Sequence, residues 1–429
     1  MQRNYHSFPI KDNTELKNKM LDWSNRFNIC CFLDNNSYLS SHNTVECLVG
    51  VGVLKAFEPS VNFFDSLSVF VESANDYIFG HFNYELKDIT EPCLSSYHKD
   101  FIGFPEYFLF IPEVVLLLEE NILHIGVFSQ DANIIYQDIV DIEKTYKTNP
   151  YVDINARITK AQYIEAVDNL QRHIHLGDCY VINYCQEFYA YANVDPVLLY
   201  TQLVQRSPNP FAAYYKLVDH YLLCASPERF IKKEGSTIIS QPIKGTAPRN
   251  YTDKVSDDLS KEQLYNSLKE RSENVMVVDL VRNDLGRICK TGSVEVDELF
   301  GIYTFPNVHQ MISTVCGQLT DDIGFGDILK SMFPMGSMTG APKHRVMELT
   351  EQYEYSLRGI YSGTVGYIAP NKDFDFNVVI RSIVYNATAL YLSYQVGSAI
   401  TAYSNPEDEY IECLLKGRAI ASLLTGEGQ

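Results

Sequence analysis

Short segments rich in β-branched and aromatic residues recur along most of this 429-residue chain, and they constrain its fold more than any other feature. Early segments read NICCFLD and ILHIGVFS, and later ones read FAAYYKLVDHYLLCAS, STIISQPIKGT, GTVGYIAP, DFNVVIRSIVYN and ALYLSYQVGSA. Long helical patterns lie between some of them, without a regular strand–helix–strand alternation. The sequence therefore predicts an α+β fold with mostly antiparallel sheets.

Length and one polar stretch indicate how the chain is divided. A chain of this length forms two or three domains, or one large composite fold. The stretch DIEKTYKTNPYVDINARI is polar and poor in strand-forming residues, and it separates the early strands from the rest. We therefore expect an N-terminal domain over residues 1–150 and a second domain over residues 151–429.

Three helices carry recognisable end signals. The first begins with a capping box at residues 159–162 and ends at Gly177. The second begins with a box at residues 260–263 and runs through LYNSLKERSENVMVVDLV. The third has Asn405 as its cap, Pro406 at its first position and acidic residues in its first turn.

Charge and cysteine usage exclude several classes of protein. The formal net charge of -19 argues against nucleic acid and anionic membrane surfaces as partners, because both attract basic patches. The ten cysteines form no CxxC pair and no zinc pattern. The N-terminus lacks the apolar core of a signal peptide, and the longest apolar stretch, YFLFIPEVVLLL, is too short and interrupted to span a membrane. We expect a cytoplasmic protein.

Lys244 lies in the segment QPIKGTAPR, at residues 241–249. Gly245 allows the backbone to turn, while Pro242 and Pro248 restrict it on either side, so Lys244 is held in place. Most lysines are surface charges, and burial or a charged neighbour is needed to make one a nucleophile. A Schiff base between this lysine and pyridoxal phosphate is an alternative, which predicts visible absorbance of the purified protein.

Three carboxylates are candidates for chemistry. Glu228, in SPERF, follows a proline at a strand end and is a candidate general acid, although such a residue is usually part of a turn. Glu273 lies where a helix becomes apolar, and Glu412 shares a helix face with Lys416, with which it can form an ordinary exposed ion pair. Two carboxylates from distant helices also suit a magnesium ion, which needs few protein ligands.

Three further features have both a functional and an ordinary interpretation. In FPMGSMTGAPK, Gly336 and Gly340 leave backbone N–H groups free to bind an anion, or simply form a turn. We expect Arg381 to lie within a strand dominated by Val and Ile, where it either binds a carboxylate or points outward. His309, in NVHQMISTV, is either catalytic or a hydrogen-bonded core residue.

In this order, the motifs resemble those of the chorismate-utilising enzymes, over about residues 155–425. The matching segments are GDCYVINYCQEF, SPERF, PIKGTAPR, LKERSENVMVVDLVRNDLGRI, VHQMISTVCG, FPMGSMTGAPKHRVMEL, RGIYSGTVGYI, NVVIRSIV and VGSAITAYSNPEDEYIECLLK. The resemblance implies antiparallel sheets packed as a sandwich with helices outside. Residues 1–150 look like the more variable domain of that family.

The resemblance implies amination of chorismate at ring carbon C4, with magnesium as cofactor, on a route to p-aminobenzoate and folate. Related anthranilate synthases carry alanine in the position of Lys244, as PIAGT, whereas lysine is typical of the enzymes that aminate C4. In the implied route Lys244 attacks ring carbon C2 as the C4 hydroxyl leaves, and ammonia then displaces it. Glu228 is the implied general acid and base, and Glu273 and Glu412 are the implied magnesium ligands.

The resemblance also implies a set of substrate contacts. Arg381, Tyr367 and the backbone N–H of Gly397 are the implied contacts of a substrate carboxylate. Thr246 and His309 are expected beside the ring, and the loop from Gly336 to Gly340 is expected to close next to them.

Two absences refine the expected activity. Val181 stands where isochorismate synthases place a lysine that activates water, which argues against an isochorismate or salicylate synthase. No cysteine lies in the GxCxGxQ pattern of glutamine amidotransferases, so we expect ammonia to come from a separate glutaminase subunit. The alternatives are anthranilate synthase component I and a non-catalytic subunit that binds chorismate or an amino acid.

Overall fold

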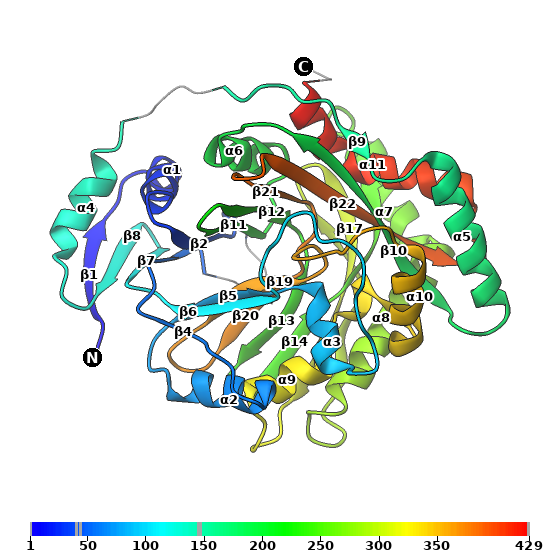
Figure 1. Ribbon diagram of the computed structural model, residues 1–429, viewed down its shortest axis with the longest axis horizontal. Helices are drawn as coiled ribbons and strands as arrows, with labels where there is room; N and C mark the ends of the chain where they lie inside the picture. The colour runs from blue at the N-terminus through cyan, green and yellow to red at the C-terminus, as the bar shows by residue number, and fades with distance from the viewer. Residues whose placement is uncertain (1, 39–41, 43–44, 144–147, 427–429) are drawn as a thin grey trace.

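Two large antiparallel sheets organise the computed structural model, which describes residues 2–38, 42, 45–143 and 148–426 (Figure 1). The strands of the first sheet are, in spatial order, β1 (Asn4–Pro9), β8 (Ile122–Val127), β7 (Val114–Glu119), β3 (Cys47–Val51), β2 (Ile29–Asp34), β11 (Phe211–Leu217), β12 (His220–Ser226), β21 (Ser382–Asn386), β22 (Tyr391–Thr401), β10 (Val181–Tyr191) and β18 (Gly340–Ala341), with β9 (Asn155–Ala156) paired to β10. Those of the second are β15 (Ile243–Pro248), β17 (Val308–Gln318), β14 (Thr237–Gln241), β13 (Arg229–Glu234), β20 (Phe374–Asn377), β19 (Thr364–Ile368), β5 (Ile78–Phe82), β6 (Tyr107–Ile111) and β4 (Lys55–Ala56), with β16 (Glu295–Thr304) paired to β17.

The side-chain alternation of the strands builds a sandwich. Cys31 and Leu48 face the second sheet and share a buried cluster with Phe79 and Val365, which come from that sheet. The neighbouring residue Phe32 faces the opposite side, toward the outer helices, because successive side chains of a strand point to opposite faces. The predicted α+β sandwich is confirmed.

Helices cover the two outer faces of the sandwich. The first sheet packs against α1 (Asn13–Ser24), α4 (Ala132–Val140), α5 (Lys160–His175), α6 (Pro196–Arg206), α10 (Lys343–Tyr353) and α11 (Pro406–Thr425). The second packs against α2 (Phe63–Ser73), α8 (Leu268–Leu285) and α9 (Phe325–Met332). The shorter or more peripheral helices are η1 (Tyr84–Leu86), α3 (Lys87–Thr90), α7 (Lys254–Asn266) and η2 (Gly336–Met338).

The predicted division at residue 150 does not coincide with a break between sheets. In the first sheet β2 pairs with β11, and in the second β5 pairs with β19, so segments from both sides of residue 150 contribute to both sheets. Residues 144–147 of the polar stretch lie outside the described residues.

Two of the three predicted helix starts are confirmed. α5 carries the capping box between Thr159 and Gln162. At the start of α11, the Asn405 side chain accepts hydrogen bonds from backbone N–H groups of the first turn. The prediction of a single second helix that begins at residue 260 was wrong, because two consecutive helices, α7 and α8, occupy this part of the chain. Asp253 caps α7, and Ser267, in extended conformation, ends α7 and caps α8. Because a capping residue has extended backbone angles, Ser267 cannot cap α8 and also continue α7 as part of one long helix.

Two chain segments cross between the sheets side by side, and they position the site described below. The first joins β12 to β13 through Pro227 and Glu228, and the second joins β20 to β21 through residues 378–381. They are linked because the Val378 N–H donates to the Glu228 carbonyl oxygen at 3.0 Å. Arg381 therefore lies at a crossover with φ of 53°, and the expectation that it lies within a strand was wrong.

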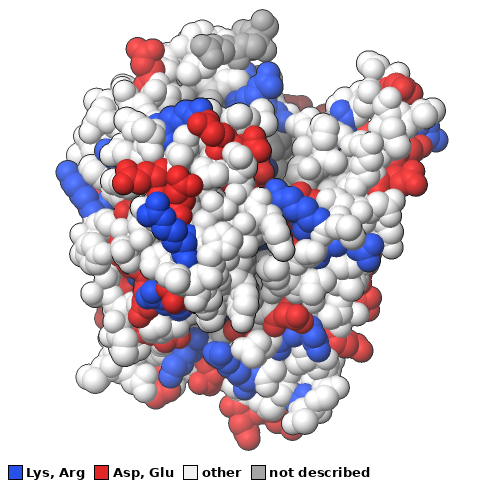
Figure 2. All heavy atoms as spheres, turned by 90° about the vertical axis from the view of Figure 1, so that its right-hand side faces the viewer, with Lys and Arg blue, Asp and Glu red and all other residues white. Residues whose placement is uncertain are grey.

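Figure 2 shows how charged side chains are distributed on one face of the molecule. Figure 2 shows one face of the molecule, on which Lys and Arg side chains lie among Asp and Glu and do not gather in a basic patch. In the part of the chain that the structure describes, no helix has the length and apolar character needed to cross a bilayer.

Candidate active site

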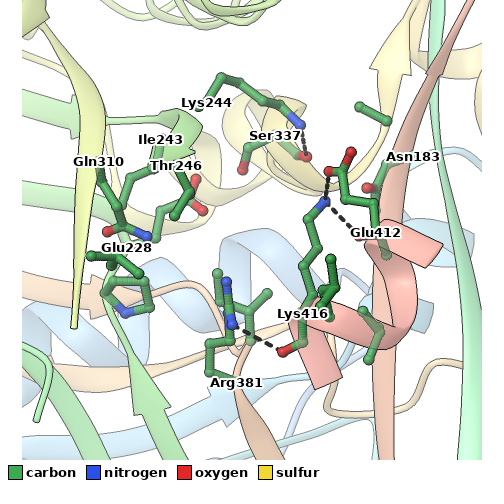
Figure 3. A pocket seen from close by; sticks show the side chains of 18 of the residues that line it. Asn183, Glu228, Ile243, Lys244, Thr246, Gln310, Ser337, Arg381, Glu412 and Lys416 are labelled. Atoms are coloured by element: carbon green, nitrogen blue, oxygen red, sulfur yellow. Dashed lines mark hydrogen bonds and ion pairs between the residues drawn. The ribbon is translucent and has the colours of Figure 1, made fainter. Parts of the chain in front are cut away.

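A cavity of 570 Å³ opens where the crossovers meet β15, β17, β10 and β22, with α8, α11 and η2 completing its wall. The structure brings many of the predicted site residues together in it (Figure 3). Those that line the cavity are Glu228, Lys244, Thr246, Glu273, Arg381, Gly397 and Glu412. They come from six separate segments of the chain, so the cavity exists only in the folded protein.

A β-bulge presents Lys244 to the cavity. Ile243 pairs with Ile312 and Thr246 with Gln310, so β15 carries an extra residue between these two pairs. Gly245 takes up the bulge with φ of 94°, a conformation that favours glycine. The Lys244 ammonium nitrogen, Nζ, donates to the Ser337 carbonyl oxygen at 3.4 Å. The lysine is thus held in place, as its sequence context predicts.

The surroundings of Lys244 favour its neutral form. Burial lowers the pKa of Lys244, and the positive charge of Lys416 lowers it further. The carboxylates of Glu273 and Glu228 oppose this shift without cancelling it. A lysine with a lowered pKa is neutral for a larger fraction of the time, and only the neutral amine is a nucleophile.

Glu228 is buried, with 4% of its surface exposed, at the first crossover. Burial raises the pKa of Glu228 to about 7, against the opposing effects of the Ser337 side chain and Lys244. A carboxyl group with this pKa holds and releases a proton near neutral pH, which is what a general acid and base requires.

Three carboxylates of the cavity wall, Glu270, Glu273 and Glu412, interact electrostatically. Burial raises the pKa of both Glu270 and Glu273, the negative charge of Glu412 adds to both shifts, and that of Glu270 adds to the shift of Glu273. Burial alone favours the protonated form of Glu412, but the charges of Lys416 and Lys269 outweigh it and lower its pKa. Two carboxylates from different helices, Glu273 of α8 and Glu412 of α11, are enough protein ligands for a hard cation that also takes oxygens from water and a bound anion.

Lys416 connects several parts of the cavity wall. Its Nζ lies 2.9 Å from Glu412 Oε1 and donates to the Gly397 carbonyl oxygen at 3.3 Å. Its own backbone carbonyl accepts from Arg381 Nη1 at 3.0 Å (Figure 3). The i,i+4 ion pair expected from the sequence therefore exists, but it lies at the cavity and not on an open helix face.

Two residues predicted to contact substrate lie outside the cavity. His309 is fully buried, and its Nε2 lies 2.9 Å from Asp257 Oδ1, so the interpretation as a hydrogen-bonded core histidine is correct. Its strand neighbours Val308 and Gln310 line the cavity, because they face the opposite side of β17. Tyr367 faces the layer between the sheets, where its ring centroid lies 6.2 Å from that of Tyr77, and Tyr361 lines the cavity.

The predicted glycine cradle also differs from expectation. Neither Gly336 nor Gly340 lines the cavity, whereas Ser337 and Met338 between them do. A Cβ atom at Gly340 would lie 2.0 Å from the Val181 carbonyl oxygen, so this glycine permits close packing of β18 against β10. These glycines let the loop approach its neighbours, and they do not form an anion site in the cavity wall.

Sequence reasoning missed several cavity residues. Glu270 could have been found, because it lies three residues before Glu273 on one face of α8. Gln310 could have been found from strand alternation next to His309. Ser337, Asn183 and Tyr361 come from other segments, and no local signal identifies them.

Comparisons with known proteins identify chains that are similar to this one. Aminodeoxychorismate synthase component 1 of Salmonella typhimurium is 40% identical over 257 residues, 60% of this chain and 56% of that protein. The protein of the same name from Escherichia coli is 39% identical over 272 residues, 63% of this chain and 59% of that protein. The chain thus spans less than two thirds of the length of these relatives.

Anthranilate synthase component I from Streptococcus pneumoniae shares the fold, with a TM-score of 0.78, 22% identity and coverage of 90% of this chain and 94% of that one. A family profile described as chorismate binding enzyme matches residues 40–422. Because this match covers most of the chain, the protein belongs to the family of chorismate binding enzymes.

Proposed function

We propose that this chain aminates chorismate to 4-amino-4-deoxychorismate, as an aminodeoxychorismate synthase component I. The observation that carries the proposal is Lys244, which a β-bulge presents to the cavity beside a buried carboxyl group, Glu228. The names of the relatives from Salmonella typhimurium and Escherichia coli support the same activity. The product belongs to the synthesis of p-aminobenzoate and folate.

The first step forms a covalent bond to Lys244. Its neutral amine attacks ring carbon C2, the two ring double bonds shift, and the C–O bond at C4 breaks. Glu228 donates its proton to the departing hydroxyl, which leaves as water. The lowered pKa of Lys244 and the raised pKa of Glu228 supply the free amine and the proton.

The second step exchanges ammonia for the lysine. Ammonia attacks C4, the double bonds return to their original positions, and the bond between C2 and the Lys244 nitrogen breaks. Glu228 accepts the proton that the new ammonium group loses. Two successive displacements leave the amino group in the position that the hydroxyl occupied, and one water is released for each ammonia consumed.

The cations of the cavity complement the two carboxylates of chorismate. Arg381, Lys269 and Lys416 line the same cavity as Lys244. Arg381 is fixed at its crossover by the hydrogen bond to the Lys416 carbonyl, which leaves other guanidinium N–H groups for a substrate carboxylate. Thr246 and the Gly397 backbone are further contacts in this proposal.

Magnesium fits two carboxylates of the cavity wall. Glu273 and Glu412 come from α8 and α11 and offer the oxygen ligands that magnesium prefers. Within the described ranges, no group of three or more His, Cys, Asp or Glu residues forms a metal site, so two carboxylates and the substrate are the expected ligands. When bound, magnesium neutralises a substrate carboxylate and holds it against these helices.

A separate glutaminase subunit is the proposed source of ammonia, since the chain lacks the GxCxGxQ pattern. The designation component 1 of the relatives agrees with a partner subunit. We propose that the protein acts in the cytoplasm. Anthranilate synthase component I remains the second candidate, supported by a shared fold, but Lys244 beside the ring argues against it.

Product identification tests the proposal. The protein is incubated with chorismate, magnesium and ammonium, and the products are separated by chromatography with mass detection. Wild type is expected to form 4-amino-4-deoxychorismate, and Lys244→Ala to lose this product. Formation of anthranilate by the wild type would contradict the proposal.

A further inference from the structure

Gln310 lines the cavity, and its side-chain oxygen has no hydrogen-bond donor among the described residues. Gln310 lies on β17 opposite Thr246 of β15, and only 4% of its surface is exposed. Its side chain faces the cavity on the wall that also carries Ile243, across from Glu412 and Lys416 in Figure 3. Among the residues that the structure describes, none donates a hydrogen bond to Gln310 Oε1.

Such an acceptor has a free-energy cost unless a ligand supplies a donor. Most buried polar side-chain atoms in folded proteins have a hydrogen-bond partner, because an unpaired buried acceptor loses its interactions with water. An unpaired carboxamide oxygen at a cavity wall is therefore suited to accept an O–H or N–H from a bound molecule. An amide oxygen does not titrate, so this preference holds at every pH at which the enzyme works.

Chorismate has one group that can donate a hydrogen bond to Gln310 Oε1. At neutral pH both carboxylates of chorismate are ionised and its enol ether oxygen only accepts, so the C4 hydroxyl is its single hydrogen-bond donor. Glu228, the proposed acid for that hydroxyl, lines the same cavity as Gln310. We propose that Gln310 is a specificity-determining residue, whose Oε1 accepts the hydrogen bond of the C4 hydroxyl and orients this group toward Glu228. The inference rests on the proposed function.

The proposal predicts how the protein discriminates between two ligands. Equilibrium binding is measured in magnesium buffer without ammonium, for chorismate and for its counterpart with hydrogen in place of the C4 hydroxyl. All proteins in this comparison carry Lys244→Ala, which prevents a covalent bond to chorismate, so wild type here means wild type at residue 310. Wild type is expected to prefer chorismate by at least about tenfold. Gln310→Leu is expected to lower this preference by about tenfold, because it removes the acceptor.

Further variants separate this role from a structural one. Gln310→Glu retains an acceptor oxygen and is expected to keep the preference while binding both anionic compounds more weakly. Gln318→Leu, at the exposed end of the same strand, is the control and is expected to behave like wild type. If Gln310→Leu does not fold, as judged by thermal melting, Gln310→Met takes its place.

The outcomes distinguish this inference from the proposed function. A preference for chorismate that is undiminished in Gln310→Leu, or a wild type that binds both compounds equally, overturns the inference alone. If Gln310→Leu keeps the full preference and, in the protein that retains Lys244, raises the ammonium concentration needed for half-maximal rate, ammonia is the donor and the assignment to the hydroxyl is wrong. A wild type that binds neither compound contradicts the proposed function itself.

Discussion

Lys244 Nζ donates to the backbone carbonyl of Ser337 at 3.4 Å, which joins the bulge in β15 to the short helix η2 across the cavity. Lys244 lies at an irregularity in β15, and Ser337 lies in a helix of only three residues. The extra residue in β15 points the lysine inward, and the loop before β18 supplies the acceptor. The proposed nucleophile therefore depends on backbone geometry as well as on the residue itself.

Replacement of Gly245 by alanine tests this dependence. Its φ of 94° is strained for alanine, and the new Cβ would lie 3.1 Å from both Glu270 Oε2 and Leu264 Cδ1. We expect a loss of about 1–2 kcal/mol in the free energy of unfolding, together with a large fall in kcat. The measurements are denaturant unfolding and the steady-state rate with ammonium.

The matched control is Gly235→Ala, in the exposed turn between β13 and β14. Gly235 has φ of 60° and no atom within 4 Å of the new Cβ, so it shares the backbone strain but lies away from the cavity. We expect a similar loss of stability with an unchanged kcat. Equal losses of kcat in both variants would show that the bulge does not position Lys244.

Stability should depend on pH through Glu228. Because burial raises its pKa from 4.5 to about 7, the folded protein retains a proton that the unfolded chain has already lost between these two values. Stability therefore falls as pH rises through this window, by about 3 kcal/mol in total. Glu228→Gln should remove this loss. The free energy of unfolding of the variant, relative to that of wild type, should therefore be higher at pH 8 than at pH 4.

Denaturant unfolding at several pH values provides the measurement. Glu262→Gln, on the exposed side of α7, is the control and should not change the pH dependence. A Glu228→Gln variant whose stability follows the wild-type curve at every pH would show that Glu228 titrates normally and cannot act as proposed.

Magnesium dependence should respond to the carboxylates of α8 and α11. Glu273→Gln and Glu412→Gln each remove one proposed ligand, and we expect the magnesium concentration for half-maximal activity to rise at least about tenfold. Titration of activity with magnesium measures this shift, again with Glu262→Gln as control. Unchanged half-maximal concentrations in both variants would exclude these residues as ligands.

His309 should behave as a structural residue. Its imidazole lies 2.9 Å from Asp257 and outside the cavity, so His309→Leu leaves that carboxylate without one of its partners. We expect a melting temperature lowered by several degrees, with little change in KM for chorismate. A raised KM with an unchanged melting temperature would instead return His309 to the substrate site.

The sequence motifs predicted the proposed reacting groups, which line the cavity, better than they predicted the rest of the cavity wall. Lys244 and Glu228 could be predicted because short local patterns with proline and glycine fix their backbones. His309 and Tyr367 were misplaced because the side of the strand that faces the cavity depends on strand pairing. Arg381 was assigned to a strand because Val and Ile surround it, although the chain there crosses from one sheet to the other.

The division into domains shows the same limit. The polar stretch near residue 150 is visible in the sequence, but the pairing of β2 with β11 and of β5 with β19 joins residues that are far apart in the chain. Such pairing depends on complementary faces in the whole sandwich and has no local signal.

The covalent bond to Lys244 is the central claim, and mass spectrometry tests it most directly. The protein is mixed with chorismate and magnesium without ammonium, quenched in acid and digested. The account predicts a peptide containing Lys244 whose mass is increased by that of chorismate minus water, and which disappears when ammonium is added before the quench. A wild-type enzyme that forms 4-amino-4-deoxychorismate without this adduct, while Lys244→Ala retains the activity, would contradict it.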